Sequence, residues 1–216
     1  MRSVVVNEIF TSLQGETTKA GLPCTFVRLT GCNLRCSYCD TEYAFHEGDE
    51  KPIDDVLSEV ERRGVRFVTV TGGEPLLQEN APELVRSLLD AGCDVQVETS
   101  GAVDTASLDP RARVILDIKT PGSRMLHAML WSNLERTRAA AGDEVKFVLV
   151  DRADYEFARD VIRQGKVPAG VPVLMSPAHG TLAPGDLAAW ILDDRLPVRL
   201  QLQIHKYVWG AGARGV

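Results

Sequence analysis

Short apolar runs along the chain alternate with longer stretches in which apolar residues recur at helical spacing. The short runs predict six β-strands, over residues 25–29, 67–71, 94–98, 114–118, 145–150 and 171–175. Apolar residues every three or four positions predict helices over 55–63, 82–91, about 127–141, 152–164 and 184–193. Three of these helices are followed by Gly64, Gly92 and Gly165, and glycine commonly ends a helix.

The order of these elements predicts the fold class. Strands that alternate with helices form βα units and a mostly parallel sheet, in which the crossover connections are right-handed. About six such units are too few to close an eight-stranded barrel, which typically needs about 250 residues. We therefore expect an α/β fold, a partial and open (β/α)6-type barrel that forms a single domain over residues 1–216.

Composition narrows the class of protein. The 216 residues are 44% hydrophobic and 25% charged, as in globular proteins, and the formal net charge is -6. An acidic excess argues against direct binding of nucleic acid over a broad surface. No apolar run approaches the roughly 18 residues of a membrane span, and the N-terminus lacks the apolar stretch of a signal peptide. We expect a cytoplasmic protein with no membrane partner.

Three of the five cysteines, Cys32, Cys36 and Cys39, lie within eight residues, directly after the first predicted strand. An odd number of cysteines with this clustering does not indicate a disulfide framework. In a reducing compartment, clustered cysteines more often bind metal or do redox chemistry. Thiolates are the usual ligands of iron–sulfur clusters, and most cubane clusters take four. Three thiolates would leave one iron open to a small molecule.

Two other interpretations of the cysteines remain open. A structural zinc site would need a fourth ligand, which Cys93 or a histidine could supply. A redox pair of Cys36 and Cys39 would leave Cys32 unexplained. Cys24 and Cys93 themselves are expected to be small buried hydrophobic residues, as most free cysteines are.

The C-x3-C-x2-C loop, with the aromatic Tyr38 before its last cysteine, resembles the radical S-adenosylmethionine (SAM) superfamily. A second superfamily feature is the glycine pair of Gly72-Gly73-Glu74-Pro75, directly after the strand predicted over 67–71. Glycines let the backbone approach a ligand closely, and open parallel sheets bind ligands at the carboxyl ends of their strands. The resemblance implies a [4Fe-4S] cluster on Cys32, Cys36 and Cys39. It also implies SAM contacts from Tyr38, Gly72, Gly73, Glu74, Glu98, Ser100 and Lys119.

Further segments resemble the 7-carboxy-7-deazaguanine synthase family within that superfamily. The most discriminating are Leu13-Gln14-Gly15-Glu16 before the cysteines and His205-Lys206-Tyr207 near the end. Others are Phe26–Leu34, Cys39-Asp40-Thr41, Val97–Gly101 and Asp117-Ile118-Lys119, so the resemblance runs from residue 7 to about 207. It implies a short substrate-binding extension at the N-terminus and a C-terminal tail on one radical SAM domain.

That resemblance also implies a reaction. The substrate would be 6-carboxy-5,6,7,8-tetrahydropterin, and the products 7-carboxy-7-deazaguanine and ammonia, for queuosine or another 7-deazapurine. Hydrogen abstraction from the pterin, ring contraction and loss of ammonia would follow, with the radical carried by SAM rather than by a catalytic side chain. Mg2+ would bind Thr41. A flavodoxin- or ferredoxin-type protein would supply electrons, and the enzyme would be a homodimer. The implied substrate-binding residues are Leu13, Gln14, Gly15, Glu16, Arg28, Thr71, His205 and Val216.

The chemistry of these side chains suits a carboxypterin. Arg28 could form a two-pronged contact with its carboxylate, and Gln14 and Glu16 could complement its amide and amino edge. Hard Mg2+ prefers oxygen ligands and keeps several waters, which fits one threonine hydroxyl. Alternatives stay open: a structural salt bridge for Arg28, a solvated acid for Glu16, a core position for His205, and a frayed terminus at Val216.

Two motifs depart from the family pattern. Many members read LQGEG, whereas Thr17 follows Glu16 here, and many read SPK where this chain has Asp117-Ile118-Lys119. These differences concern local contacts rather than the family resemblance as a whole. The alternative functions are a radical SAM activase of a glycyl-radical enzyme, which would dock a large partner, and a non-catalytic zinc module.

Overall fold

The computed structural model describes residues 2–216; Met1, at which the expected domain begins, lies outside the described residues. Within this range, nine strands form one sheet in the order β3-β1-β2-β4-β5-β6-β7-β8-β9. The strands are β1 (Ser3–Leu13), β2 (Pro23–Leu29), β3 (Asp49–Pro52), β4 (Phe67–Gly72), β5 (Asp94–Thr99), β6 (Arg113–Ile118), β7 (Glu144–Leu149), β8 (Val173–Pro177) and β9 (Arg199–Leu200).

The α-helices are α1 (Ile53–Arg63), α2 (Ala81–Asp90), α3 (Ser132–Glu135), α4 (Arg152–Arg163), α5 (Pro184–Asp194) and α6 (Ile204–Val208). Gly64 ends α1 with φ of 72°, and Gly92 and Gly165 follow α2 and α4 with φ of 80° and 67°. These left-handed conformations confirm the predicted helix ends, because glycine adopts them without steric cost. Within residues 2–216, no helix combines the length and apolar character needed to span a bilayer.

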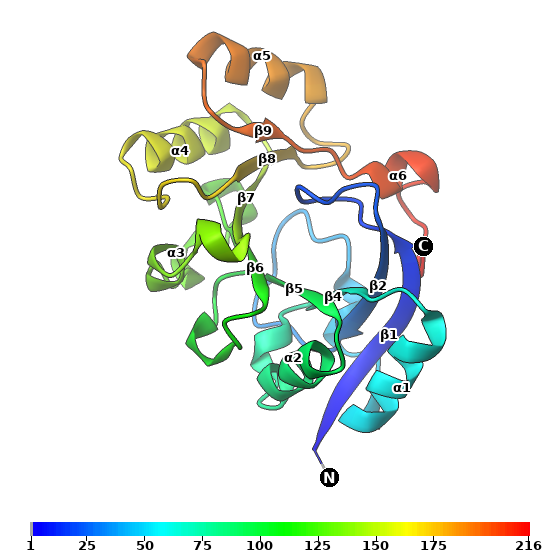
Figure 1. Ribbon diagram of the computed structural model, residues 1–216. Helices are drawn as coiled ribbons and strands as arrows, with labels where there is room; N and C mark the ends of the chain where they lie inside the picture. Colours follow the sequence, from blue (N-terminus) through cyan, green and yellow to red (C-terminus); the bar gives the residue numbers. More distant parts are fainter. Residues whose placement is uncertain (1) are drawn as a thin grey trace.

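From β2 to β9, neighbouring strands pair in parallel and form a curved sheet. Figure 1 shows these strands as an arc with α1 to α5 around its outer side, and with α6 beside the gap between β9 and β1. The six predicted strands correspond to β2, β4, β5, β6, β7 and β8. The expected partial, open barrel is confirmed.

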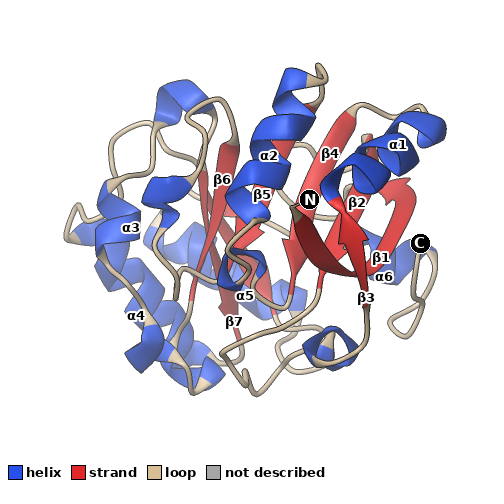
Figure 2. Cartoon of the chain, turned by 90° about the horizontal axis from the view of Figure 1, so that it is seen from below, coloured by secondary structure: helices blue, strands red, loops and turns tan. Residues whose placement is uncertain are grey.

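Alternation along the strands separates the two faces of the sheet. On β4, Val68 and Val70 join the core beneath α1 and α2, while Thr69 and Thr71 alternate with them toward the concave side. Figure 2 shows α2 covering this outer face beside β5. The same alternation places Glu98 of β5 on the concave side. A second core beneath α4 and α5 is built from the outward residues of β6, β7 and β8. The apolar outer face thus fixes which polar residues point inward.

The N-terminal extension forms an 11-residue strand that the apolar pattern did not predict. β1 pairs antiparallel with β2, from Val6 opposite Leu29 to Leu13 opposite Pro23. It also pairs antiparallel with β3. Its polar residues include Asn7 and Glu8, which interrupt the apolar run, although Val4, Val6 and Phe10 are buried. The loop of residues 14–22 joins β1 to β2, and its first residues, Gln14, Gly15 and Glu16, lie on the concave side of the sheet.

The prediction of a helix over about 127–141 is wrong. That segment contains the four-residue α3 between the short 3-10 turns Leu126–Ala128 and Ala139–Ala141. Asn133, 1% exposed, holds it by donating to the carbonyls of Gly101 and Val103 and accepting from the Thr105 amide. Residues 138–141 lie on the surface without a buried apolar face. Helix propensity alone does not stabilise a helix without such a face.

Candidate active site

A cavity of about 720 Å3 lies on the concave side of the sheet. It is lined by the β1–β2 loop, the cysteine loop, the ends of β4 to β7 and the C-terminal tail. All but one of the site residues expected from the sequence line it, and the exception is Glu74. They are Leu13, Gln14, Gly15, Glu16, Arg28, Cys32, Cys36, Tyr38, Cys39, Thr41, Thr71, Gly72, Gly73, Glu98, Ser100, Lys119, His205 and Val216.

The cysteine loop leaves the carboxyl end of β2 and crosses one side of the cavity. The Cys39 amide donates to the Cys36 carbonyl at 3.1 Å, which folds the loop into a turn. Ser37 anchors this turn by donating to the carbonyls of Gly122 and Ser123. Burial raises the pKa of all three half-buried thiols. A bound metal reverses that effect, because a coordinating thiol is deprotonated.

The glycine pair after β4 lies directly against the cysteine loop. A Cβ atom built on Gly72 would overlap the Leu29 carbonyl oxygen, and one on Gly73 would overlap the Gly31 carbonyl and Cys32. Only glycine permits this approach, and it leaves the backbone of the pair exposed to the cavity.

Glu74 has a different position from the one that its motif implied, because its side chain is fully buried and does not line the cavity. One carboxylate oxygen accepts from the Leu76 amide at 3.0 Å, and the other accepts from the Ser100 amide at 2.7 Å. Thr99 and Ser100 also donate their hydroxyls to it. Glu74 therefore joins the loop after β4 to the end of β5, which places Ser100 at the cavity wall.

Unpartnered polar atoms lie in the cavity wall around Cys36. The Tyr38 hydroxyl and one oxygen of Asp117 are buried without a hydrogen-bond partner among residues 2–216. Burial raises the pKa of Tyr38 above its ordinary value. The Lys119 ammonium lies 3.1 Å from Asp117 and 5.8 Å from the centre of the Tyr38 ring. Buried polar groups are normally hydrogen-bonded, so these orphans are consistent with a polar ligand beside the cysteine loop.

The β1–β2 loop supplies the opposite wall. Gln14 donates to Thr69 at 3.1 Å and to Glu98 at 3.2 Å. Its side-chain oxygen accepts from the Glu16 amide at 2.9 Å. Thr71 also donates to Glu98, at 3.3 Å, and burial is the main reason that the pKa of Glu98 is raised. The loop is thereby fixed to the inner face of β4 and β5.

Arg28 forms a salt bridge with Glu8 and also lines the cavity. Its Nε donates to Glu8 at 2.7 Å, and its guanidinium lies over the Phe10 ring and beside the Tyr43 ring. Its two terminal nitrogens make no hydrogen bond to residues 2–216. The Glu8 contact thus orients the guanidinium and leaves its outer donors free for an anion.

His205 is packed against the β1–β2 loop. A Cβ atom on Gly15 would overlap the His205 ring, and the Ile204 amide donates to the Gly15 carbonyl at 3.0 Å. Burial lowers the pKa of His205, although the nearby Glu16 and Asp40 carboxylates oppose that effect. The two most discriminating sequence motifs, LQGE and HKY, are therefore in contact in the folded chain.

Thr41 lies at the cavity rim, and its hydroxyl donates to Asp40 at 2.9 Å. Gln203 and Lys206 donate to the other Asp40 oxygen, which ties α6 to the cysteine loop. Burial alone would raise the pKa of Asp40, but Lys206 and these hydrogen bonds lower it to about 2. Within residues 2–216, no three His, Cys, Asp or Glu side chains gather closely enough to bind one metal ion.

Comparison with known proteins decides the family. Residues 26–136 match the radical SAM superfamily. The 7-carboxy-7-deazaguanine synthase of Koribacter versatilis is 42% identical over 98% of this chain and 99% of its own length. The synthase of Chlorobaculum tepidum is also 42% identical, over 98% and 96%. The chain belongs to the 7-carboxy-7-deazaguanine synthase family. It is a radical SAM enzyme, and neither the activase nor the zinc module is favoured.

The fold is also similar to that of a solved structure. The crystal structure of QueE from Escherichia coli superposes with a TM-score of 0.77 over 93% of each chain, at 23% identity. In the present chain, the three half-buried thiols on one loop suit the [4Fe-4S] cluster of a radical SAM enzyme. The glycine backbone and the unpartnered atoms near Tyr38 suit SAM beside it.

Sequence reasoning assigned no role to several residues of the cavity wall. Lys146 and Asp117 come from β7 and β6, and Gln203 and Lys206 come from the C-terminal segment. A signal for the first two was present, because each is a charged residue with an apolar residue on either side within its strand. Lys206 belongs to the HKY motif, but no local pattern indicated that it and Gln203 contact Asp40, which lies more than 160 residues away.

Proposed function

We propose that the protein converts 6-carboxy-5,6,7,8-tetrahydropterin to 7-carboxy-7-deazaguanine and ammonia. One observation carries the proposal. The cavity joins the cysteine loop and glycine pair on one side to Gln14, Glu16 and Arg28 on the other. Family membership supports the class of reaction. The side chains of Gln14, Glu16 and Arg28 support a carboxypterin as the substrate, because they can bind its carboxylate and its ring edge.

Cys32, Cys36 and Cys39 would hold the cluster, and the backbone of Gly72 and Gly73 would approach SAM. Ser100, Lys119 and Tyr38 would complete that side of the cavity. When bound, the cluster and SAM supply the 5′-deoxyadenosyl radical that abstracts hydrogen from the substrate. Enclosure of the site by protein keeps water away from such reactive species.

The chain's own residues would bind and orient the pterin. The free nitrogens of Arg28 would bind its carboxylate. The Glu16 carboxylate would accept from its ring N–H groups. Glu98, whose raised pKa favours the protonated form, would be able to donate. Leu13, Gly15, Thr71, His205 and Val216 would enclose the remaining faces.

Four further features belong to this proposal. Mg2+ would bind the Thr41 hydroxyl, with substrate oxygens and waters as its other ligands, because it prefers oxygen and keeps several waters. A flavodoxin- or ferredoxin-type protein would deliver electrons. The enzyme would work as a homodimer in the cytoplasm, and its product would serve queuosine or another 7-deazapurine. A reducing compartment suits its clustered free thiols.

The test is anaerobic reconstitution followed by mass spectrometry. The cluster-loaded enzyme would be given dithionite, SAM, Mg2+ and the tetrahydropterin. We expect catalytic formation of 7-carboxy-7-deazaguanine that requires every component. Slow cleavage of SAM without this product would overturn the proposed substrate and leave the radical SAM chemistry intact.

A further inference from the structure

The Lys146 side chain lines the cavity on the concave side of the sheet. It extends from β7 and is 8% exposed, and its ammonium lies 2.7 Å from Glu16 and 3.5 Å from Asp117. These partners come from the β1–β2 loop and from β6, so the lysine connects distant parts of the chain. A lysine is almost never buried unless it is paired, and an unpaired one would be costly.

Both oxygens of the Glu16 carboxylate are held. Oε2 accepts from Lys146 at 2.7 Å, and Oε1 accepts from Gln203 at 2.9 Å. A carboxylate oxygen can accept more than one hydrogen bond, so each keeps capacity toward the cavity. Two fixed contacts leave the carboxylate little freedom to rotate.

The charges around this pair favour its ionised form. The groups that face Lys146 are Glu16, Asp117, Glu98, Lys119, His205 and Tyr38. Burial would lower the pKa of Lys146, but the three carboxylates raise it well above its ordinary value. Burial would likewise raise the pKa of Glu16, but the charge and hydrogen bond of Lys146 lower it. The same burial without the lysine would favour a neutral Glu16, as it does for Glu98.

Lys146 also reaches the other side of the cavity. The Asp117 oxygen that it approaches is bonded to Lys119 at 3.1 Å, while the second oxygen is unpartnered among residues 2–216. The chain Glu16–Lys146–Asp117–Lys119 thus crosses the cavity wall from the substrate-binding loop to the cysteine loop.

We propose that Lys146 is a positioning residue that holds the Glu16 carboxylate as a fixed hydrogen-bond acceptor for the substrate ring. It does not touch the reacting atoms and acts through Glu16. The inference rests on the proposed function, since it takes the pterin as the ligand of Glu16.

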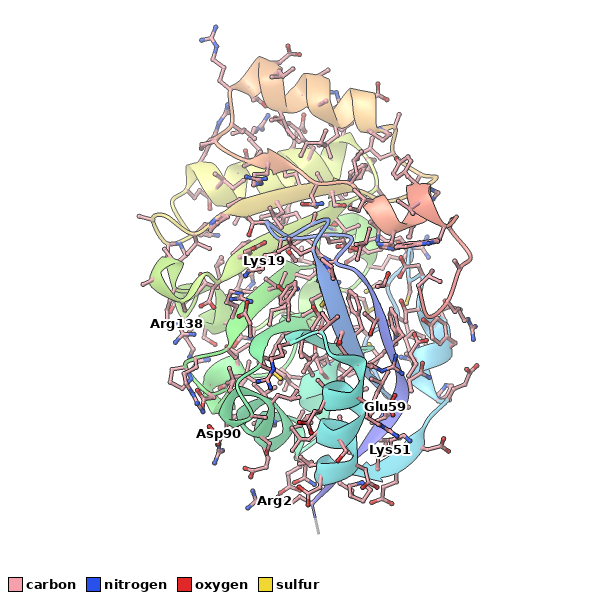
Figure 3. The ribbon with its side chains drawn as sticks, turned by 45° about the vertical axis from the view of Figure 1, so that its right-hand side comes forward. Arg2, Lys19, Lys51, Glu59, Asp90 and Arg138 are labelled. Atoms are coloured by element: carbon pink, nitrogen blue, oxygen red, sulfur yellow. The ribbon has the colours of Figure 1, made fainter. Side chains whose placement is uncertain are left out.

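The test measures equilibrium binding, which does not depend on turnover. The oxidised analogue 6-carboxypterin would be titrated into cluster-loaded protein with SAM and Mg2+, and its fluorescence would report binding. We expect Lys146→Met to weaken its binding about 10- to 100-fold, the range of a charge-assisted hydrogen bond. SAM affinity should change less than about threefold. Lys51→Met is the matched control, because Lys51 is exposed on β3 beside α1, outside the cavity (Figure 3).

Two further readouts separate positioning from general damage. The double variant Lys146→Met with Glu16→Gln should bind no more weakly than Glu16→Gln alone, because the lysine acts through that carboxylate. Lys146→Met should also regain affinity as the pH rises, when its unpaired Glu16 ionises, whereas the wild type should not. Lys146→Arg keeps the charge and should recover part of the affinity. If Lys146→Met does not fold, Lys146→Arg takes its place in the double variant with Glu16→Gln.

The outcomes distinguish the two proposals. Wild-type protein that binds the pterin while Lys146→Met binds it equally well overturns only the positioning role. Losses that add in the double variant also overturn it, since they would show that Lys146 acts independently of Glu16. Wild-type protein that binds SAM but neither 6-carboxypterin nor the tetrahydropterin overturns the proposed function, and this inference with it.

Discussion

At the scale of single residues, the cavity is built from polar side chains that alternate with core residues on the same strands. Asp117 lies between Leu116 and Ile118, both of which are fully buried in the outer core. Such a strand cannot rotate to move its polar residue without exposing its apolar neighbours. The hydrophobic effect therefore helps to hold the site residues in place.

The cluster assignment makes the first prediction. Cys36→Ala should remove the [4Fe-4S] cluster, because two thiolates on this loop do not suffice to hold it. The measurement is iron and sulfide content after anaerobic reconstitution. Cys93→Ala is the matched control, since Cys93 is only partly buried and does not line the cavity. A Cys36→Ala protein with full iron, sulfide and activity would contradict the ligand assignment.

Arg28 makes the second prediction. Arg28→Ala should weaken binding of the carboxypterin about 10- to 100-fold and spare SAM, because it removes charged donors. Arg28→Lys keeps a cation near Glu8 but lacks the fork, so we expect an intermediate affinity. Equilibrium binding of both ligands checks this. Equal pterin affinity in all three proteins would mean that Arg28 serves only its salt bridge with Glu8.

At the scale of elements, the β1–β2 loop carries backbone strain at Thr17. Its φ is 66°, a left-handed conformation that is rare for a β-branched residue, and its side chain is buried. The loop is nevertheless anchored, because Thr18 donates from its backbone and its hydroxyl to Glu144 at the start of β7.

Thr17→Gly should therefore stabilise the protein by about 1 kcal/mol, the lower end of the cost of such a conformation. The melting temperature should rise by roughly 2–4 °C. Thr17→Ala is the control, since it keeps the strain and loses the hydroxyl that accepts from the Lys19 amide. A glycine variant less stable than the alanine variant would refute the account of strain.

Glu74 joins two elements and gives the fourth prediction. Its two oxygens accept from two different backbone amides, those of Leu76 and Ser100. Glutamine has only one acceptor oxygen, so Glu74→Gln should leave one buried amide facing an NH2 group. We expect a loss of about 2–3 kcal/mol of unfolding free energy in urea. Glu79→Gln, at an exposed position, should change it little, and an equal loss there would contradict the argument.

At the scale of the whole molecule, the C-terminal segment and the β1–β2 loop meet at the cavity. Residues 203–216 contact the β1–β2 loop through Gln203 and His205. Near the terminus, Arg214 lies 3.8 Å from the centre of the Tyr43 ring and 3.5 Å from Glu47. The C-terminal segment therefore completes the cavity, and Figure 1 shows it crossing the gap in the arc.

This closure predicts a pH dependence. Burial lowers the pKa of His205 below its ordinary value of 6.5, so just below that pH the unfolded chain binds more protons than the folded one. Stability should fall as the pH drops from 6.5 toward the folded pKa. His205→Gln should remove this part of the fall, whereas the exposed His127→Gln should not.

Urea unfolding of cluster-free wild type and both variants at pH 7.5 and 5.5 measures the effect. The lowered pKa values of Glu16 and Asp40 also favour a loss of stability in acid, but all three proteins share them. The difference between wild type and His205→Gln isolates the histidine. An identical pH dependence in these two proteins would show that His205 is not held neutral by the fold.

The sequence by itself determined the class of fold, the cysteine loop and the family. Six strands, the ends of three helices and the glycine pair could be predicted because each depends on local spacing and on backbone conformation. The helix expected over 127–141 could not be corrected from the sequence, because the bonds of Asn133 to residues 101–105 exist only after folding. β1 escaped prediction because its polar residues interrupt its apolar pattern.

Only the tertiary structure decided how the site residues act. It buried Glu74 between the loop after β4 and the end of β5. It paired Arg28 with Glu8 at the edge of the cavity. It also brought Lys146 into contact with Glu16, which lies 130 positions away in the sequence. Hydrogen bonds and ion pairs between distant segments leave no periodic signal along the chain. Their strength depends on burial and separation in space, which the folded sheet sets.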